Sequence, residues 1–379
     1  MLLNLTSDQE FFRDTTAKFL TEHASPTEIR RLRDDPDGFE DRYWKAGAEL
    51  GWTSLLVDGE HGGGSISGDG LIDLTLVAHE FGRHAAPGPL VPTNLVAHAI
   101  SESSPGRRTD MLAGLLDGTA IASWCHREPR PHDGLSDIAL EVGVDGPDIV
   151  LNGTKRPVEA AERATYLLVN GRSPSGLTQV VVPRDTAGVS VRPMRGVDLT
   201  RRFCEVTFDD VRLPAGSALG AVGEAGEQIE RQFELALVVA NAESVGAMEY
   251  AFELTVEWAF DRYSFGRPLA SYQELKHRFA DMKTWLEAGH AISDVAAQAV
   301  SARSAQAGEL VSAAKAFIGD YGSELIQDCV QIHGGIGLTF EHDIHLFLRR
   351  VTANRVLYGT PGEHRQRIAS VVEHLGGVA

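Results

Sequence analysis

The chain has 379 residues, of which 43% are hydrophobic and 23% charged, and this is typical of a globular protein with two or three domains. Its formal net charge of −18 argues against nucleic acid or an anionic membrane surface as the main partner, because the long-range field repels both.

The beginning of the chain lacks a basic stretch followed by an apolar run of signal-peptide length, and no later segment approaches the roughly 20 apolar residues of a membrane span. We therefore expect a cytoplasmic protein without membrane contact. The three cysteines, Cys125, Cys204 and Cys329, are too few and too scattered for a disulfide framework or a metal cluster, so we expect reduced thiols.

Residues 1–117 are predicted to form a helical domain. Ser7 and Glu10 form a capping-box pattern ahead of Phe11 and Phe12, which predicts a helix from about residue 7. Helical patterning returns around residues 41–51, 71–83 and 92–101, with glycine- and proline-rich turns between these segments.

Residues 118–220 are predicted to form a small antiparallel β domain. Short β-rich runs lie at 148–151, 166–169, 180–182 and 203–208, separated by Gly, Pro, Asn and Asp turns. From there to residue 379 the pattern is that of long helices, with clear breaks at 334–337 and 361–362.

The helical, β, helical order, together with the segments DRYSFGRPLASYQ (261–273) and QIHGGIG (331–337), is similar to the acyl-CoA dehydrogenases. The resemblance implies an α+β fold with an N-terminal helical domain (1–117), a middle antiparallel β-barrel (118–220) and a C-terminal four-helix bundle (221–379). It also implies FAD as the cofactor and an acyl-CoA thioester as the substrate.

The first of these segments contains the family pattern R-x-x-F-G, whose arginine contacts FAD together with a glutamine eleven residues later. The pattern falls on Arg262, Ser264 and Phe265, and the glutamine on Gln273. A permanently charged arginine suits a pyrophosphate group, although Arg262 taken alone is an ordinary arginine at a helix end.

The second segment contains the family pattern Q-x-x-G-G, whose backbone lies against the adenine half of the cofactor. It covers Gln331, Ile332, His333, Gly334 and Gly335. Glycines without a side chain allow backbone amides to approach such a ligand closely.

The catalytic base of the family is a glutamate that removes the α-proton of the thioester while the β-hydrogen leaves as hydride. It comes either from a Y-E-G-T segment near the C-terminus, where this chain places Gly359, or from a position 26 residues before Arg262, where it has Ala236 followed by Leu237. Both family positions therefore lack a carboxylate. Glu243, two helical turns beyond Ala236, is the remaining candidate base, with the alternative that it is a buried carboxylate satisfied by a neighbour.

The segments that face the flavin ring in the family also differ here. Arg127 stands where a threonine would hydrogen-bond the flavin, and Pro157 and Glu159 replace the tryptophan and threonine of a K-x-W-I-T segment. A carboxylate at residue 159 would oppose an anionic reduced flavin.

In this family one subunit holds the flavin ring, while its neighbour contributes the arginine, glutamine and Q-x-x-G-G contacts. The chain retains the residues given to the neighbour and lacks those used for itself. We therefore predict the base-lacking subunit of an α2β2 acyl-CoA dehydrogenase, which clamps FAD bound by a catalytic partner and passes electrons to an electron-transfer flavoprotein. It resembles the paired dehydrogenases of actinobacterial steroid side-chain degradation.

Three alternatives stay open. The chain could be a self-sufficient homo-oligomeric dehydrogenase with Glu243 as base, a flavin monooxygenase of the same fold, or a purely structural partner. No metal site is predicted, because His342 and His345 are spaced i, i+3 with no third ligand group in view.

Overall fold

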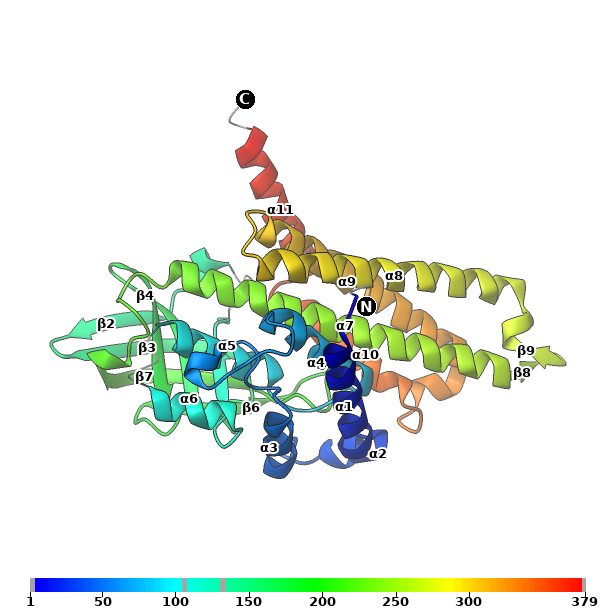
Figure 1. Cartoon of the computed structure of the whole chain (residues 1–379), viewed down its shortest axis with the longest axis horizontal. Coiled ribbons are helices and arrows are strands. Elements are labelled where there is room, and N and C mark those ends of the chain that lie inside the picture. The colour runs from blue at the N-terminus through cyan, green and yellow to red at the C-terminus, as the bar shows by residue number, and fades with distance from the viewer. Residues whose placement is uncertain (1–3, 104–107, 130–133, 377–379) are drawn as a thin grey trace.

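The computed structural model describes residues 4–103, 108–129 and 134–376, and it has the predicted order of helices, strands and helices (Figure 1). The first part is helical, as predicted. Its helices are α1 (Ser7–His23), α2 (Pro26–Leu32), α3 (Asp41–Glu49), α4 (Gly70–His84), α5 (Leu90–Ser103) and α6 (Thr109–Leu116).

The capping box of α1 lies one residue earlier than predicted. Thr6 is the N-cap: its hydroxyl accepts from the Gln9 amide at 3.2 Å, and Gln9 Oε1 accepts from the Thr6 amide at 3.1 Å. The Thr-x-x-Gln pattern competes with the predicted Ser7 pair, and it is favoured because Gln9 also donates to the buried Asp73 at 2.8 Å. On this helix Phe11 is 75% exposed, whereas Phe12 enters the core.

The middle part forms one sheet with the strand order β1-β4-β2-β3-β7-β6 and with β5 paired to β4. Its strands are β1 (Ala122–Cys125), β2 (Glu141–Asp145), β3 (Asp148–Glu159), β4 (Tyr166–Ser173), β5 (Gly176–Pro183), β6 (Val189–Met194) and β7 (Phe203–Pro214).

This sheet departs from the prediction in two ways. It is mixed, because β4 runs parallel to β1 and meets β2 in parallel, and within the described residues the hydrogen-bonded path has two ends rather than closing as a barrel. The parallel pairing arises because β1 is followed by the β2–β3 hairpin, so that the chain returns beside it in the same direction.

The last part is a bundle of long helices, α7 (Gly226–Asp261), α8 (Gln273–Ser301), α9 (Ala307–His333), α10 (Ile344–Val356) and α11 (Pro361–Gly376). A short hairpin of β8 (Tyr263–Ser264) and β9 (Arg267–Pro268) joins α7 to α8 at the end of the bundle far from the sheet (Figure 1).

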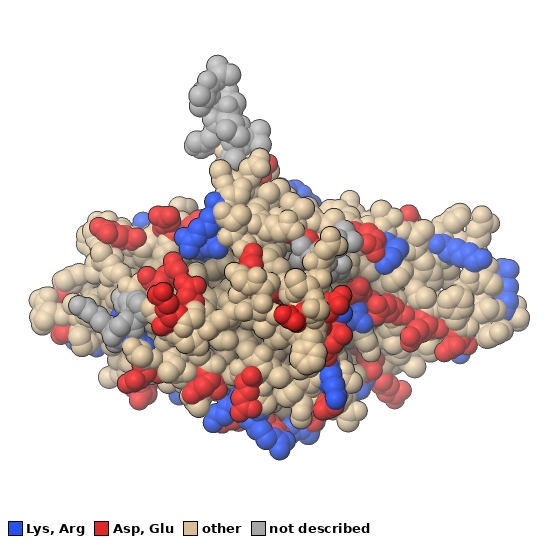
Figure 2. All heavy atoms as spheres, in the orientation of Figure 1, with Lys and Arg blue, Asp and Glu red and all other residues tan. Residues whose placement is uncertain are grey.

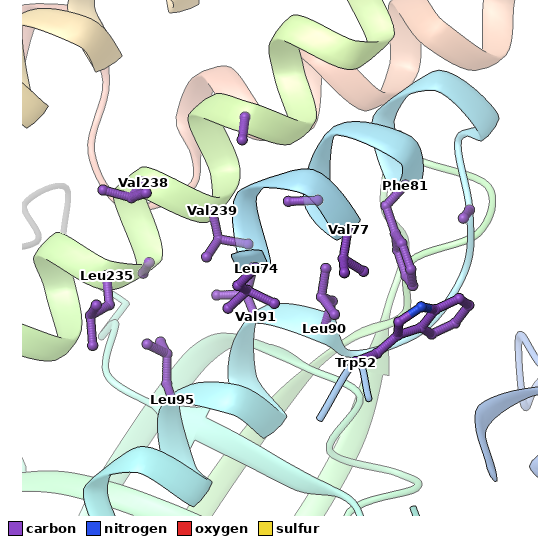
Figure 3. Packing of buried hydrophobic residues seen from close by; sticks show 14 of the residues in the cluster. Trp52, Leu74, Val77, Phe81, Leu90, Val91, Leu95, Leu235, Val238 and Val239 are labelled. Carbon is purple, nitrogen blue, oxygen red and sulfur yellow. The ribbon is translucent and has the colours of Figure 1, made fainter. Parts of the chain in front are cut away.

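Helix α4 crosses α7 at backbone contact distance, and two glycines make this possible. A Cβ atom on Gly82 would lie 1.9 Å from the carbonyl oxygen of Glu243, and one on Gly246 would lie 2.0 Å from that of His79. Figure 3 shows the apolar side chains beside this crossing, where Leu74 and Val77 of α4 lie between Val239 of α7 and the helix α5. The crossing fixes which polar residues of the two helices can meet.

Acidic side chains are scattered over the visible face of the molecule (Figure 2), in keeping with the net charge of −18. Among the described helices, none combines the length and apolar character required to cross a bilayer.

Candidate functional site

The two segments predicted to contact FAD meet at the hairpin end of the bundle, where both contact Trp258. The guanidinium carbon of Arg262 lies 5.9 Å from the Trp258 ring centre, and the imidazole of His333 stacks on the same ring at 5.3 Å. Arg262 and His333, which are 71 positions apart in the sequence, therefore contact the same indole ring. Sequence reasoning missed Trp258, although an aromatic residue four positions before Arg262 lies on the same face of a helix.

The hairpin presents its predicted contact residues outward. Arg262 is exposed directly after α7, and Phe265, at a φ of 49°, is 98% exposed at the turn. Ser264 uses its carbonyl oxygen to accept from the Tyr272 hydroxyl at 2.7 Å, and Gln273 begins α8 with an exposed side chain. An exposed arginine beside exposed aromatic surface can bind an anionic, partly apolar ligand or a second chain.

At the C-terminal end of α9, the groups that a ligand could contact are mainly backbone atoms. Gln331 is exposed and Ile332 half-buried, whereas His333 is buried with Nδ1 2.8 Å from the Cys329 carbonyl oxygen. Burial lowers the pKa of His333, which favours the neutral imidazole. Gly334, with a φ of 68°, and Gly335 have no atom within 4 Å of a notional Cβ, so the backbone is open to a ligand.

The segments predicted to face a flavin ring lie at the boundary between the sheet and the bundle, where the described residues make direct contacts. Arg127 Nη1 donates to the Val356 carbonyl oxygen at 3.0 Å, and the Trp124 ring lies 6.1 Å from that of Tyr358. Trp124 also stacks on His126 at 4.5 Å. Protein side chains thus occupy the boundary between the two parts of the chain.

A buried ion-pair network continues this boundary. Arg201 Nε donates to Glu159 Oε1 at 2.7 Å, and its Nη1 donates to Asn354 Oδ1 at 2.7 Å and lies 3.3 Å from Glu243 Oε2. Arg201 is 5% exposed and therefore joins the end of β3 to α7 and α10 inside the protein.

Arg350 of α10 completes the network and is fully buried. It donates from Nη1 to Glu243 Oε1 at 2.7 Å and from Nε to Asp198 Oδ2 at 2.5 Å, and its Nη2 reaches the carbonyl oxygens of Ala85 and Ala86. Burial alone would raise the pKa of Asp198, but the Arg350 charge outweighs it and holds this pKa below its usual range. The network links all three parts of the chain.

Glu243, the candidate base, lies at the centre of this network. Its two oxygens face Arg350, Arg201 and the Asn354 amide, whose Nδ2 donates at 2.8 Å, and its residue exposure is 6%. These partners hold both oxygens of the carboxylate in charge-assisted hydrogen bonds, away from solvent. Its role as a base stays a prediction.

The family base positions are filled in other ways. Ala236 and Leu237 are fully buried in the core along α7. Gly359 has a φ of 93°, and a Cβ there would lie 2.8 Å from His364 Nε2. The side chain that reaches Trp124 from this segment belongs to the preceding residue, Tyr358.

One small cavity touches the network. It has a volume of about 10 Å³ and is lined by residues that include Glu159, Thr200 and Arg201. A void of this size lies at the lower limit for a single water molecule.

His342 and His345, which the sequence suggested do not form a metal site, lie in different surroundings. His342 packs against His333 with ring centres 4.3 Å apart, and His345 packs against Phe340 at 4.9 Å.

A helical region, a central sheet and a long-helix bundle, with the R-x-x-F-G and Q-x-x-G-G segments together at one bundle end, define the class of flavoprotein dehydrogenase folds. Three family models match the chain: the acyl-CoA dehydrogenase N-terminal domain over residues 6–119, the middle domain over 134–211 and the C-terminal domain over 227–373. The chain belongs to the acyl-CoA dehydrogenase family.

Among curated proteins, the chain is 29% identical to "Acyl-CoA dehydrogenase IpdE2" of Mycolicibacterium smegmatis, over 97% of this chain and 100% of that protein. Among solved structures, it is similar to a variant of the "Tcur3481-Tcur3483 steroid ACAD", with 25% identity, a TM-score of 0.88 and coverage of 98% and 99%. A glutaryl-CoA dehydrogenase of Mycobacterium smegmatis in complex with FADH2 has the same fold, with 21% identity, a TM-score of 0.88 and coverage of 97% and 95%. The prediction of an FAD-dependent acyl-CoA dehydrogenase fold is confirmed at the level of the family.

Proposed function

We propose that this chain is the base-lacking subunit of a heteromeric acyl-CoA dehydrogenase, in which it clamps an FAD whose ring is held by a catalytic partner subunit. The observation that carries the proposal is the buried Arg201 bridge between Glu159 and Glu243. It lies where the family-matched segments would otherwise face a flavin ring and a substrate.

The exposed half of the site fits the cofactor. Arg262 would bind the pyrophosphate, with Ser264, Phe265 and Gln273 beside it, and the open backbone at Gly334 and Gly335 would accept the adenine half. When bound, FAD supplies hydride acceptance for α,β-dehydrogenation of the thioester. This chain would hold and orient the pyrophosphate and adenine half of the cofactor, whose ring the partner subunit binds.

The closed half does not fit a flavin ring of its own. Arg127 is bonded to the backbone of the bundle, and Glu159 would bring a second negative charge towards a reduced flavin if Arg201 moved away. Matching the family Y-E-G-T segment to residues 358–361 puts Gly359 at the glutamate position, which leaves it without a carboxylate. We derive no catalytic step through this half.

The substrate class follows from similarity. The similarity of this chain to the Tcur3481-Tcur3483 steroid acyl-CoA dehydrogenase supports a steroid-derived acyl-CoA as substrate and a two-chain enzyme. An electron-transfer flavoprotein as acceptor follows from family membership alone.

Co-expression with a base-bearing acyl-CoA dehydrogenase subunit, followed by FAD quantitation and steroid acyl-CoA oxidation, tests the proposal. We expect one FAD for every two chains, and Arg262→Ala in this chain should lower both FAD content and turnover. Arg267→Ala is the matched control, because Arg267 is an exposed arginine of the same hairpin whose guanidinium stacks on Tyr272 at 3.8 Å. One FAD per chain with full turnover by the isolated protein would overturn the proposal.

The same experiment separates the remaining alternatives. A monooxygenase would consume oxygen without an acyl-CoA, and a purely structural partner would leave the FAD content of the complex unchanged in the Arg262→Ala variant.

A further inference from the structure

A second cluster of ionisable side chains lies in the interior, at the junction of α4, α7 and α8. It consists of His79 from α4, Glu249 from α7 and His290 from α8, and one ligand atom of each lies within 4.8 Å of the other two. His79 Nε2 is 3.0 Å from Glu249 Oε2, and His290 Nε2 is 3.6 Å from Glu249 Oε1. No step of the proposed function uses these residues.

The geometry points to a binding site for one divalent metal ion of the zinc class, held by His79, Glu249 and His290. Two imidazoles and a carboxylate are ligands of Zn²⁺, with bonds that place tetrahedral ligand atoms roughly 3.4 Å apart. The 3.6 Å separation of His290 Nε2 from Glu249 Oε1 is close to this spacing, and His79 Nε2 lies 3.0 Å from the other oxygen of the same carboxylate. Three protein ligands leave a fourth position for water.

The hydrogen bonding of His79 favours a role as a metal ligand. The residue is 6% exposed, and among the described residues neither Nδ1 nor Nε2 finds a hydrogen-bond partner of acceptable geometry, although Glu249 is within reach. A buried imidazole without a well-formed hydrogen bond is costly unless it has a partner of another kind. A metal ion on Nε2 would supply that partner.

The surrounding groups suit a metal-bound histidine. Glu80 Oε1 lies 3.5 Å from His79 Nδ1, on the side of the ring away from Glu249, and a carboxylate in that place orients a metal-bound imidazole. Glu249 is 25% exposed, which gives an ion a path from solvent.

The local charge also favours a dication. Arg83 is the cation beside the cluster, with Nη1 3.0 Å from Glu249 Oε2 and Nη2 2.7 Å from Glu253 Oε2. The carboxylates of Glu80, Glu249 and Glu253 outnumber it by two negative charges, and on α8 Lys283 and Glu287 neutralise each other at 2.6 Å. One divalent ion balances the site, while Arg83 holds one oxygen of Glu249 and leaves the oxygen nearer His290 to the metal.

The site has a structural consequence. The close α4–α7 crossing at Gly82 and Gly246 places His79 and Glu249 one helical turn from the contact point, and His290 adds the next helix of the bundle. A metal ion here would fasten the N-terminal helices to the bundle.

The test uses the tag-free full-length chain, stripped with a chelator and titrated with Zn²⁺ by calorimetry and with Co²⁺ by visible absorption. We expect one equivalent per chain, a tetrahedral Co²⁺ spectrum and a raised melting temperature. His290→Ala and Glu249→Gln should each abolish stoichiometric binding, and Glu80→Gln should weaken it on the order of tenfold or more. His277→Ala, an exposed histidine of the same helix, is the control and should bind as the parent does.

Circular dichroism of each metal-free variant establishes that it is folded. If the histidine variant does not fold, Glu249→Gln still tests the site, because it keeps the shape of the side chain and removes its charge. Absence of saturable binding near one equivalent would overturn the inference, as would binding that His290→Ala and Glu249→Gln leave unchanged.

Discussion

Arg201 and Glu159 form a side-on ion pair in the interior, with Arg201 Nε 2.7 Å from Glu159 Oε1 and Nη2 donating to Oε2. The pair joins the last residue of β3 to a guanidinium that also reaches α7 and α10. The pair lies at the boundary between the sheet and the bundle, and Arg201 is the residue that joins them there.

Arg201→Ala should destabilise the protein by about 3–5 kcal/mol, because it leaves Glu159 buried without its cation and removes one of two cations from Glu243. Urea unfolding followed by circular dichroism measures the change. Arg192→Ala is the control, since Arg192 is 73% exposed in its pair with Glu205 and exposed pairs contribute little. Equal effects of the two substitutions would contradict the closed network.

Glu243→Gln addresses the alternative in which Glu243 is the base. We expect the variant complex to retain dehydrogenase turnover but to melt at a lower temperature, because Arg350 and Arg201 lose a charged partner. The measurement pairs a steady-state assay with thermal unfolding of the same preparation. A folded complex without turnover would instead favour Glu243 as the base.

Gly359→Glu should fail to supply a catalytic base. The backbone at Gly359 has a φ of 93°, and a Cβ would lie 2.8 Å from His364 Nε2. Strain of this kind costs about 1–3 kcal/mol. We expect a lower melting temperature and no dehydrogenation by the isolated chain, measured with an artificial electron acceptor. Substrate-dependent bleaching of bound flavin in this variant would show that the site is open after all.

Much of this arrangement could be predicted from sequence because it depends on local patterns. Helix and strand order follows from periodicity and turn residues, and the exposed Arg262 hairpin and the Gly334–Gly335 turn follow from short motifs. The predicted capping residue of α1 was wrong by one position. Two capping patterns overlap there, and the hydrogen bond between Gln9 and the distant Asp73 distinguishes them.

The buried networks could not be predicted, since their members are distant in sequence. Arg350 and Asp198 are separated by 152 positions, and Glu249 meets His79 only because two glycines let α4 and α7 touch. The parallel pairing of β1 was also missed, because four residues do not show which strand they pair with or in which direction.

His364 should make stability depend on pH. Burial lowers its pKa from 6.5 to about 4, and Nε2 lies 2.8 Å from the Tyr358 carbonyl oxygen. As pH falls below 6.5 the unfolded chain binds this proton first, so folded-state stability falls between pH 6.5 and 4. A difference of 2.5 pKa units at 1.36 kcal/mol each corresponds to about 3 kcal/mol in full.

The variant His364→Gln retains a donor for the Tyr358 carbonyl oxygen and cannot titrate. We expect its unfolding free energy to decline less steeply than that of the parent between pH 6.5 and 4, as measured by urea titrations at several pH values. Parallel pH profiles of parent and variant would contradict this assignment.

Two glycine-to-alanine substitutions, one at the α4–α7 crossing and one on α8, should change the stability of the protein in opposite directions. Gly82→Ala puts a methyl group 1.9 Å from the Glu243 carbonyl oxygen, so the helices must separate, at a cost on the order of 3 kcal/mol. Gly289→Ala on α8 meets its nearest atoms at 3.7 Å and should stabilise the helix by up to about 1 kcal/mol. Because separation of α4 from α7 also moves His79 away from Glu249, Gly82→Ala should weaken Zn²⁺ binding while Gly289→Ala leaves it intact. Calorimetry and urea unfolding of both variants measure this, and a neutral Gly82→Ala would mean that the two helices are not in backbone contact.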